Sequence, residues 1–208
     1  MNKLDTIAAI ATAHGHSGVG IIRVSGANVL NIIKYFFIKK LKPRLAANRK
    51  IKDKDGSVID DVIAIYYQGP KSYTGEEMLE IQTHGNPVIL ETILNEIVPV
   101  YARLAKPGEF TERAFLNNKI DLTQAEAVAD LIFSSNAIAA KAACASLQGK
   151  FSTKITELIN NLVSLRAEIE ATIDFPEDEI PKKSMSIINN QLGRLISDTE
   201  DIVKMAKK

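Results

Sequence analysis

Residues 78–85 alternate polar and apolar side chains in a pattern that can present chemistry on one surface. In a β-strand, Glu80, Gln82 and His84 point to the same face of the sheet, and the residues between them point to the other. The row ends beside Asn86, which is placed to cap a helix whose free backbone N–H groups suit an anionic or polar ligand. A ligand-binding row and an ordinary polar sheet surface are both open interpretations of this pattern.

A second candidate is Arg23, which lies in the middle of the otherwise aliphatic pattern of residues 19–26. A half-buried guanidinium needs a carboxylate partner, so a structural salt bridge competes with ligand binding as its role. Two polar stretches accompany it. Residues 69–77 offer hydroxyls, amides and carboxylates in one loop, and residues 106–126 cross the junction between two halves of the chain, where a crevice is expected.

Other residues are weaker candidates for a binding site. Cys144 is the only cysteine, which excludes an intrachain disulfide and a cysteine-built zinc site. His14 and His16 flank a glycine in a predicted loop, so a surface role is favoured and we predict no metal site. The basic run 39–54 has no interleaved aromatic residues, and this favours a solvated loop over phosphate contact.

The composition limits the classes of protein to consider. The chain has 208 residues, 46% of them hydrophobic, and a net charge of +1. These values argue against a disordered chain and against a protein that binds nucleic acid through charge alone. The sequence contains no pattern typical of a signal peptide or a membrane-spanning segment, so a cytoplasmic protein without membrane contact is expected.

The first half of the chain predicts an α+β domain with a mixed sheet. Helical spacing of apolar residues covers 27–38 and 87–97. Strand patterns lie around these helices without strict strand–helix alternation, which argues against a doubly wound sheet. The strand patterns are residues 6–11, 19–24, 62–67 and 78–83, with a weaker one at 98–104.

The second half predicts helices only. Thr123 and Glu126 have the spacing of a capping box, and an Ala-rich helical stretch follows toward Gly149. Apolar residues between 151 and 169 then alternate steps of four and three, as in antiparallel packed helices, and a last helix is expected over roughly 184–205. We therefore expect one domain over 1–119 and a helical one over 120–208. The helices need more partners than this sequence supplies, so a fragment is expected; the alternative is a complete protein whose helices pair across a dimer.

Several motifs together resemble the bacterial and organellar tRNA-modification GTPase family called MnmE or TrmE. The junction motif is the most specific of them, and the resemblance covers most of the chain. The matching segments are residues 5–8, 20–26, 72–77, 80–85, 107–116, 119–128 and 173–177.

The resemblance implies a fold, a cofactor and partners. Family members have an N-terminal folate-binding domain of the aminomethyltransferase type, which dimerises, and a helical domain into which a GTPase domain is inserted. With the flavoprotein MnmG they modify carbon 5 of the wobble uridine in certain tRNAs. The folate-contacting positions of the family, for 5-formyltetrahydrofolate or a related tetrahydrofolate, fall on Arg23, Glu80 and Lys119.

Departures from the family pattern concern the loop 13–18, which lacks the usual arginine, and Asn86, which stands where glycine is common. The sequence also contains no Gly-x-x-x-x-Gly-Lys-Ser/Thr phosphate loop and no C-terminal cysteine motif. GTP, Mg²⁺ and K⁺ would therefore belong to a GTPase domain outside these residues, and whether this chain is itself an enzyme stays open. Three functions are considered: a folate-binding, dimer-forming part of the tRNA modification GTPase, a purely structural dimerisation module, and a stand-alone aminomethyltransferase-type enzyme.

Overall fold

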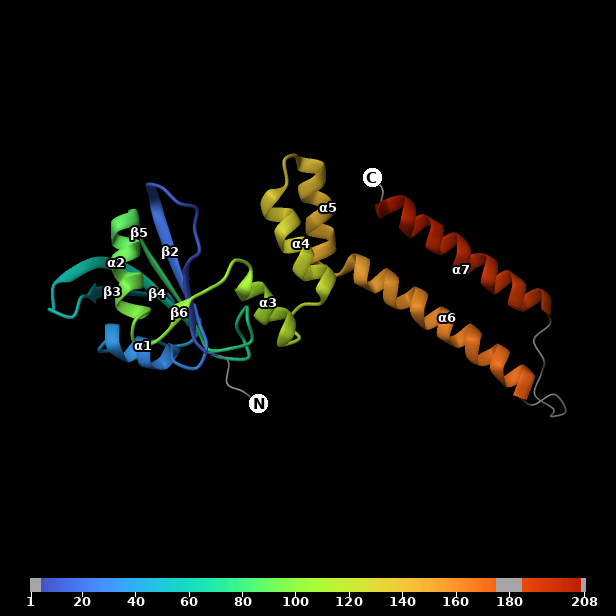
Figure 1. The fold of residues 1–208 in the computed structure, drawn as a ribbon, viewed down its shortest axis with the longest axis horizontal. Helices are drawn as coiled ribbons and strands as arrows, with labels where there is room; N and C mark the ends of the chain where they lie inside the picture. Colours follow the sequence, from blue (N-terminus) through green and yellow to red (C-terminus); the bar gives the residue numbers. More distant parts are fainter. Residues whose placement is uncertain (1–4, 175–184, 207–208) are drawn as a thin grey trace. The chain divides into compact units, whose positions relative to one another are not determined.

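A computed structural model describes residues 5–174 and 185–206. The chain divides into two compact units between Ala125 and Glu126, the first α+β and the second all-helical. Figure 1 shows the elements of both units in chain order. Within the described residues no helix is long and apolar enough to cross a membrane.

The first unit is built on one six-stranded mixed sheet with the strand order β3-β4-β5-β2-β1-β6. Every neighbouring pair is antiparallel except β1 and β6, which are parallel. The predicted α+β class with a mixed sheet is thus confirmed. The strands are β1 (Ile7–Ile10), β2 (Ser17–Ser25), β3 (Ala47–Lys52), β4 (Val58–Tyr67), β5 (Met78–Gly85) and β6 (Arg103–Leu104).

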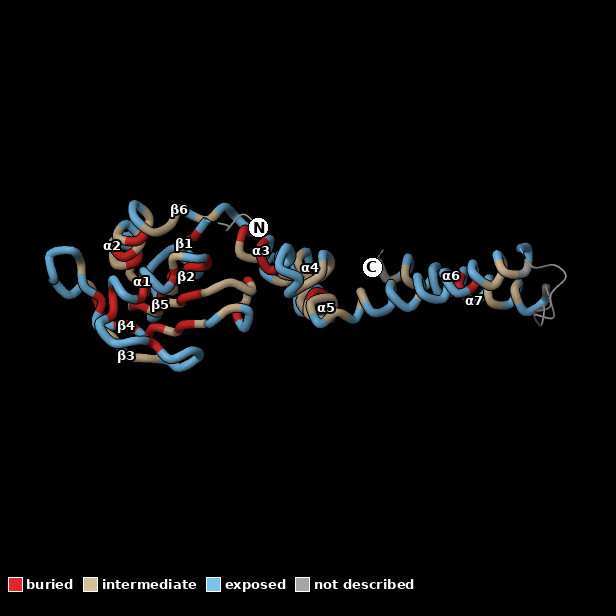
Figure 2. Tube along the Cα trace, turned by 90° about the horizontal axis from the view of Figure 1, so that it is seen from below, coloured by how far each residue is buried: buried red, intermediate tan, exposed pale blue. Residues whose placement is uncertain are grey.

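Two helices, α1 (Val29–Phe36) and α2 (Pro87–Ile97), form the main hydrophobic core with the sheet. The strands contribute alternate aliphatic side chains to this core, so short buried segments alternate with less buried ones along them in Figure 2. Helix α2 approaches β2 closely, because a Cβ added at Gly20 would lie 2.7 Å from Leu90 Cδ1. Since side chains alternate along a strand, this core leaves Arg23 and Glu80 on the opposite face of the sheet.

Three local features of the first unit differ from the sequence-based predictions. Strand β3 lies inside the basic run that we expected to be a loop. The strand expected over 98–104 shrinks to Arg103–Leu104, because the chain up to Tyr101 still makes helical hydrogen bonds to the end of α2. A short helix, α3 (Glu109–Leu116), follows β6, and its first-turn Glu109 is buried.

The cap of helix α4 (Leu122–Phe133) is displaced from the predicted one. Asp121 Oδ1 accepts from the Gln124 backbone N–H at 2.8 Å, and Gln124 Oε1 accepts from the Asp121 N–H at 2.9 Å. This is a reciprocal capping box two residues before the Thr123–Glu126 pair. The predicted Ala-rich helix is also divided, because Asn136 caps a separate helix, α5 (Ala137–Leu147), by accepting from the Ala139 N–H.

Helices α6 (Lys150–Asp174) and α7 (Met185–Ala206) run antiparallel and contact each other (Figure 1). Leu165 of α6 and Leu195 of α7 are buried, with 5% and 8% of their surface exposed. Other apolar side chains of the pair remain open to solvent, as the exposed tube in Figure 2 shows, including Leu162 at 54% and Val203 at 46%. The pair therefore buries only part of the apolar seam that the sequence predicts.

Candidate functional site

Arg23 and Glu80 are direct neighbours across β2 and β5. Arg23 Nη2 lies 2.7 Å and Nε 3.0 Å from Glu80 Oε1, so one carboxylate oxygen accepts both N–H groups. The two side chains are only partly exposed, at 29% and 12%. The salt bridge considered for Arg23 is therefore formed, and its partner is another of the predicted site residues.

Aromatic side chains surround this ion pair. The guanidinium carbon of Arg23 lies 5.5 Å from the ring centroid of Tyr73 and 5.8 Å from that of Phe110, both within cation–π range. The Tyr67 hydroxyl donates to Glu80 Oε2 at 3.3 Å, a long hydrogen bond. Burial and then the Glu80 carboxylate raise the pKa of Tyr67, so its hydroxyl stays protonated as a donor.

The Lys119 side chain contacts the loop between β4 and β5. Its Nζ donates to the Pro70 carbonyl at 3.0 Å, and its side chain is in contact distance of Gly75, where an added Cβ would lie 3.3 Å from Lys119 Cγ. Gly75 has φ +79°, a conformation that favours glycine. The same loop carries Tyr73, which contacts Arg23, so it links Lys119 to the ion pair. Within residues 5–174 and 185–206, no hydrogen bond or ion pair joins Lys119 directly to Arg23 or Glu80.

A buried charge network holds the loop and helix α3 in place. Arg113 is 2% exposed and donates to Glu76, Asp5 and Glu109 at 3.2, 3.0 and 3.1 Å. Hydrogen bonds from Arg103, and secondarily the Lys106 backbone N–H and Arg113, lower the pKa of Glu109 to about 2.

The network connects to β2 and to the aromatic side chains. Ser25 Oγ donates to Glu76 Oε2 at 2.7 Å, and the Tyr73 hydroxyl bonds the Thr111 hydroxyl at 2.9 Å. The sequence motifs 72–77 and 107–116 contain most of these groups. The roles of Tyr73, Phe110 and Arg113 were not predicted, because only the fold shows that the two motifs meet at Arg23.

His84 and the loop 13–18 lie outside the group of residues that contacts Arg23. Asp60 holds the His84 ring, with Oδ1 2.7 Å from Nδ1, and its Oδ2 accepts from the His84 backbone N–H at 2.9 Å. Asn86 caps α2 as predicted, accepting from the Val88 N–H. The loop side chains are exposed, and within the part of the chain that the structure describes no three His, Cys, Asp or Glu side chains converge as for a metal ion.

Comparison with known proteins identifies the family. Residues 6–119 match the family model described as GTP-binding protein TrmE N-terminus, and residues 122–208 match the MnmE helical domain. The chain belongs to the TrmE/MnmE family. It carries the N-terminal and helical domains of a tRNA modification GTPase.

Individual MnmE proteins are similar over most of this chain. The tRNA modification GTPase MnmE of Saccharophagus degradans is 50% identical over 98% of the chain, and that of Francisella tularensis subsp. novicida is 55% identical over 86%. The MnmE of Coxiella burnetii is 49% identical over 98%. The aligned parts make up 45%, 40% and 45% of the lengths of these three relatives, so the chain spans less than half of each.

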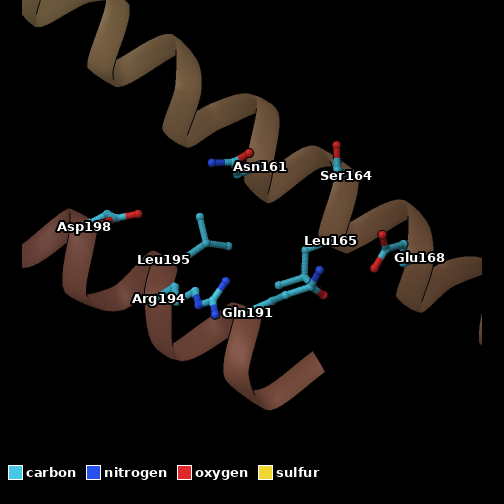
Figure 3. Close-up of a pocket in the computed structure, with 8 residues that line it drawn as sticks. All are labelled: Asn161, Ser164, Leu165, Glu168, Gln191, Arg194, Leu195 and Asp198. Carbon is cyan, nitrogen blue, oxygen red and sulfur yellow. The ribbon is translucent and has the colours of Figure 1, made fainter. Parts of the chain in front are cut away.

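The MnmE helical domain also has a polar cavity, which lies between α6 and α7 (Figure 3). It measures about 260 Å³, and the buried Leu165 and Leu195 are among its lining residues. Charged side chains from both helices line it, but none of the predicted site residues does. The charged lining residues are Glu168, Arg194 and Asp198.

Proposed function

We propose that this chain binds 5-formyltetrahydrofolate or a related tetrahydrofolate as the dimer-forming N-terminal portion of a cytoplasmic tRNA modification GTPase. The observation that carries the proposal is the partly exposed Arg23–Glu80 pair beside two aromatic rings. The modified position would be carbon 5 of the wobble uridine in certain tRNAs. When bound, the folate would supply or relay the one-carbon unit.

The chemistry of the donor set fits a reduced folate. Glu80 Oε1 already accepts two N–H groups from Arg23, whereas among the described residues Oε2 accepts only the long hydrogen bond from Tyr67. That oxygen is suited to accept an N–H of the pterin ring, because charge-assisted hydrogen bonds are the strong ones. The rings of Tyr73 and Phe110 offer apolar faces for a flat heterocycle.

Cations at the same site suit the acceptor groups of a folate. Lys119 is exposed and Arg23 is partly exposed, so either can address the formyl oxygen or the glutamate carboxylates. The two alternative functions, a purely structural dimerisation module and a stand-alone aminomethyltransferase-type enzyme, have no observation of their own in this structure. GTP hydrolysis with Mg²⁺ and K⁺ is proposed for the part of the relatives that this chain does not span.

The proposed partners are a second copy of the chain, an MnmG-type flavoprotein and tRNA. A second copy is supported by the face of the sheet opposite the core, on which a row of two isoleucines and a glutamine lies beside the Arg23–Glu80 row. Ile63, Gln82 and Ile21 are register partners in this row, and Ile63 is 42% exposed. Burial of such a face against a second copy removes apolar surface from water.

Calorimetric titration with 5-formyltetrahydrofolate tests the folate site. Glu80→Gln keeps the shape of the side chain but removes the carboxylate charge that accepts the pterin N–H. Since a hydrogen bond to a charged group contributes about 1.5–3 kcal/mol, the dissociation constant should rise about 10- to 100-fold.

The matched control is Glu91→Gln, the same chemical change at an exposed position on α2, and it should bind like the wild type. An absence of heat with the wild-type chain would refute folate binding and favour the structural module. Equal weakening by both variants would refute the role of Glu80.

A further inference from the structure

We propose that the groove between the end of α1 and the edge strand β3 binds phosphate groups of tRNA. This inference rests on the proposed function in one respect, since it takes the tRNA of the family as the partner. It concerns a surface built from other residues than Arg23, Glu80 and Lys119. The two sites can therefore be tested separately.

Positive charge is concentrated at this groove. Residues 39–54 contain eight Lys and Arg against the single acid Asp53, an excess of seven positive charges. The whole chain has an excess of one, so the remaining residues carry an excess of six negative charges. A basic segment on an otherwise acidic chain is the electrostatic pattern expected of a phosphate-binding surface.

In the described part of the chain, the cations of this segment form no close ion pairs, although Asp61 is the register partner of Lys50 and Asp53 lines the groove. Among the described residues, none of the eight cations forms an ion pair, whereas Arg23, Arg103 and Arg113 all do. Arg44 and Arg49 donate to backbone carbonyls, at 3.0 and 2.7 Å. Their positive charge therefore remains available to an anionic partner.

Five of these eight cations line a groove of about 520 Å³. Arg49 Nε has no hydrogen-bond partner and is shielded from solvent, so the side chain would have to move before a phosphate oxygen could accept from this atom. Tyr35, 40% exposed, also lines the groove and offers a ring on which a base can stack. The structure thus places aromatic residues of α1 beside the basic run, although none interleaves with it in sequence. The lining cations are Lys39, Arg49, Lys50, Lys52 and Lys54.

Protection of an exposed sheet edge is the simpler explanation for some of these charges. Strand β3 is at the edge of the sheet, where lysines prevent pairing with other chains. This accounts for Lys50 and Lys52, but Lys39 and Lys40 precede the strand and Arg49 has a buried unpaired group. Phosphate binding accounts for all of these features.

Fluorescence anisotropy of labelled tRNA, titrated with the full 208-residue chain at several salt concentrations, tests the groove. Lys39→Glu/Lys52→Glu reverses one charge on each side of the groove and should lower tRNA affinity by at least about tenfold. Loss of two phosphate contacts should reduce the slope of log K against log salt by about 1.5. Lys39→Gln/Lys52→Gln removes the two positive charges without adding negative ones, so it should also lower tRNA affinity, but by a smaller factor.

The matched control is Lys141→Glu/Lys150→Glu, which makes the same change of charge at exposed positions on α5 and α6. Retained binding by this control supports the groove, and equal loss in both double variants overturns it. Groove-dependent binding to phosphatidylserine vesicles without tRNA binding also overturns it. If the groove variants bind tRNA like the wild type but still bind 5-formyltetrahydrofolate, this inference fails while the proposed folate site stands.

Discussion

At the residue scale, the ion pair Arg23–Glu80 is compatible with both of the roles that sequence alone leaves as alternatives. The salt bridge satisfies the half-buried guanidinium through one carboxylate oxygen, Oε1. The other oxygen, Oε2, accepts from the Tyr67 hydroxyl at 3.3 Å and from no other residue in the described part of the chain, so it remains suited to a ligand. Structural support and ligand binding are therefore compatible in the same pair of side chains.

Glu109 illustrates how strongly the site depends on buried charges. The side chain is 7% exposed and bonded by Arg103 and Arg113. Its pKa is lowered from 4.5 to about 2, so the charged form stabilises the fold. This contribution to stability is fully present above pH 4.5, where Glu109 is ionised in both the folded and the unfolded chain. It is lost as the pH falls through the folded pKa near 2.

We expect Glu109→Gln to reduce the free energy of unfolding at neutral pH by about 3 kcal/mol, the value of a pKa shift of this size. The difference in unfolding free energy between the wild type and the variant should shrink as the pH falls toward the folded pKa of Glu109, because the wild-type carboxylate is then protonated and uncharged. Urea unfolding at a series of pH values measures both effects. Glu112→Gln, an exposed change on the same helix, should leave the pH profile unchanged; equal profiles for wild type and Glu109→Gln would contradict the network.

At the element scale, the sequence predicted most regular elements that form the core. Helix α2 matches its predicted bounds because Asn86 and Pro87 are strong start signals, and β5 follows from its alternation of polar and apolar residues. Strand β3 was missed because half of its side chains are charged, and its pairing with β4 is not visible in the local sequence. The motifs predict Arg23, Glu80 and Lys119 as site residues, whereas the aromatic neighbours of Arg23 required the fold.

The displaced cap of α4 gives a prediction at this scale. Asp121→Ala removes the side chain that accepts from Gln124, so it should cost about 1 kcal/mol of unfolding free energy. Thr123→Ala removes the residue predicted from sequence as the cap and should cost less than about half of that. Urea denaturation followed by circular dichroism compares the two variants, and the reverse order would contradict the observed capping box.

At the scale of the whole molecule, the proposed homodimer depends on the open sheet face of the N-terminal domain. We expect the chain to be a dimer by light scattering coupled to size-exclusion chromatography. Ile63→Asp places a charge in the row formed by Ile63, Gln82 and Ile21, and it should shift the measured molecular mass toward that of the monomer. Ile138→Asp on α5, where the side chain is 83% exposed, is the control. A dimer unaffected by Ile63→Asp would place the interface elsewhere.

The central claim is that β2, β5, the loop 69–77 and the segment around Lys119 form one folate site. The most direct test is an NMR titration of the isotope-labelled chain with 5-formyltetrahydrofolate, in which backbone amide shifts map the binding surface. The account predicts saturable shifts at Arg23, Tyr73, Glu80 and Lys119, and none along α7. Shifts confined to the helical domain, or no shifts at saturating ligand, would contradict it.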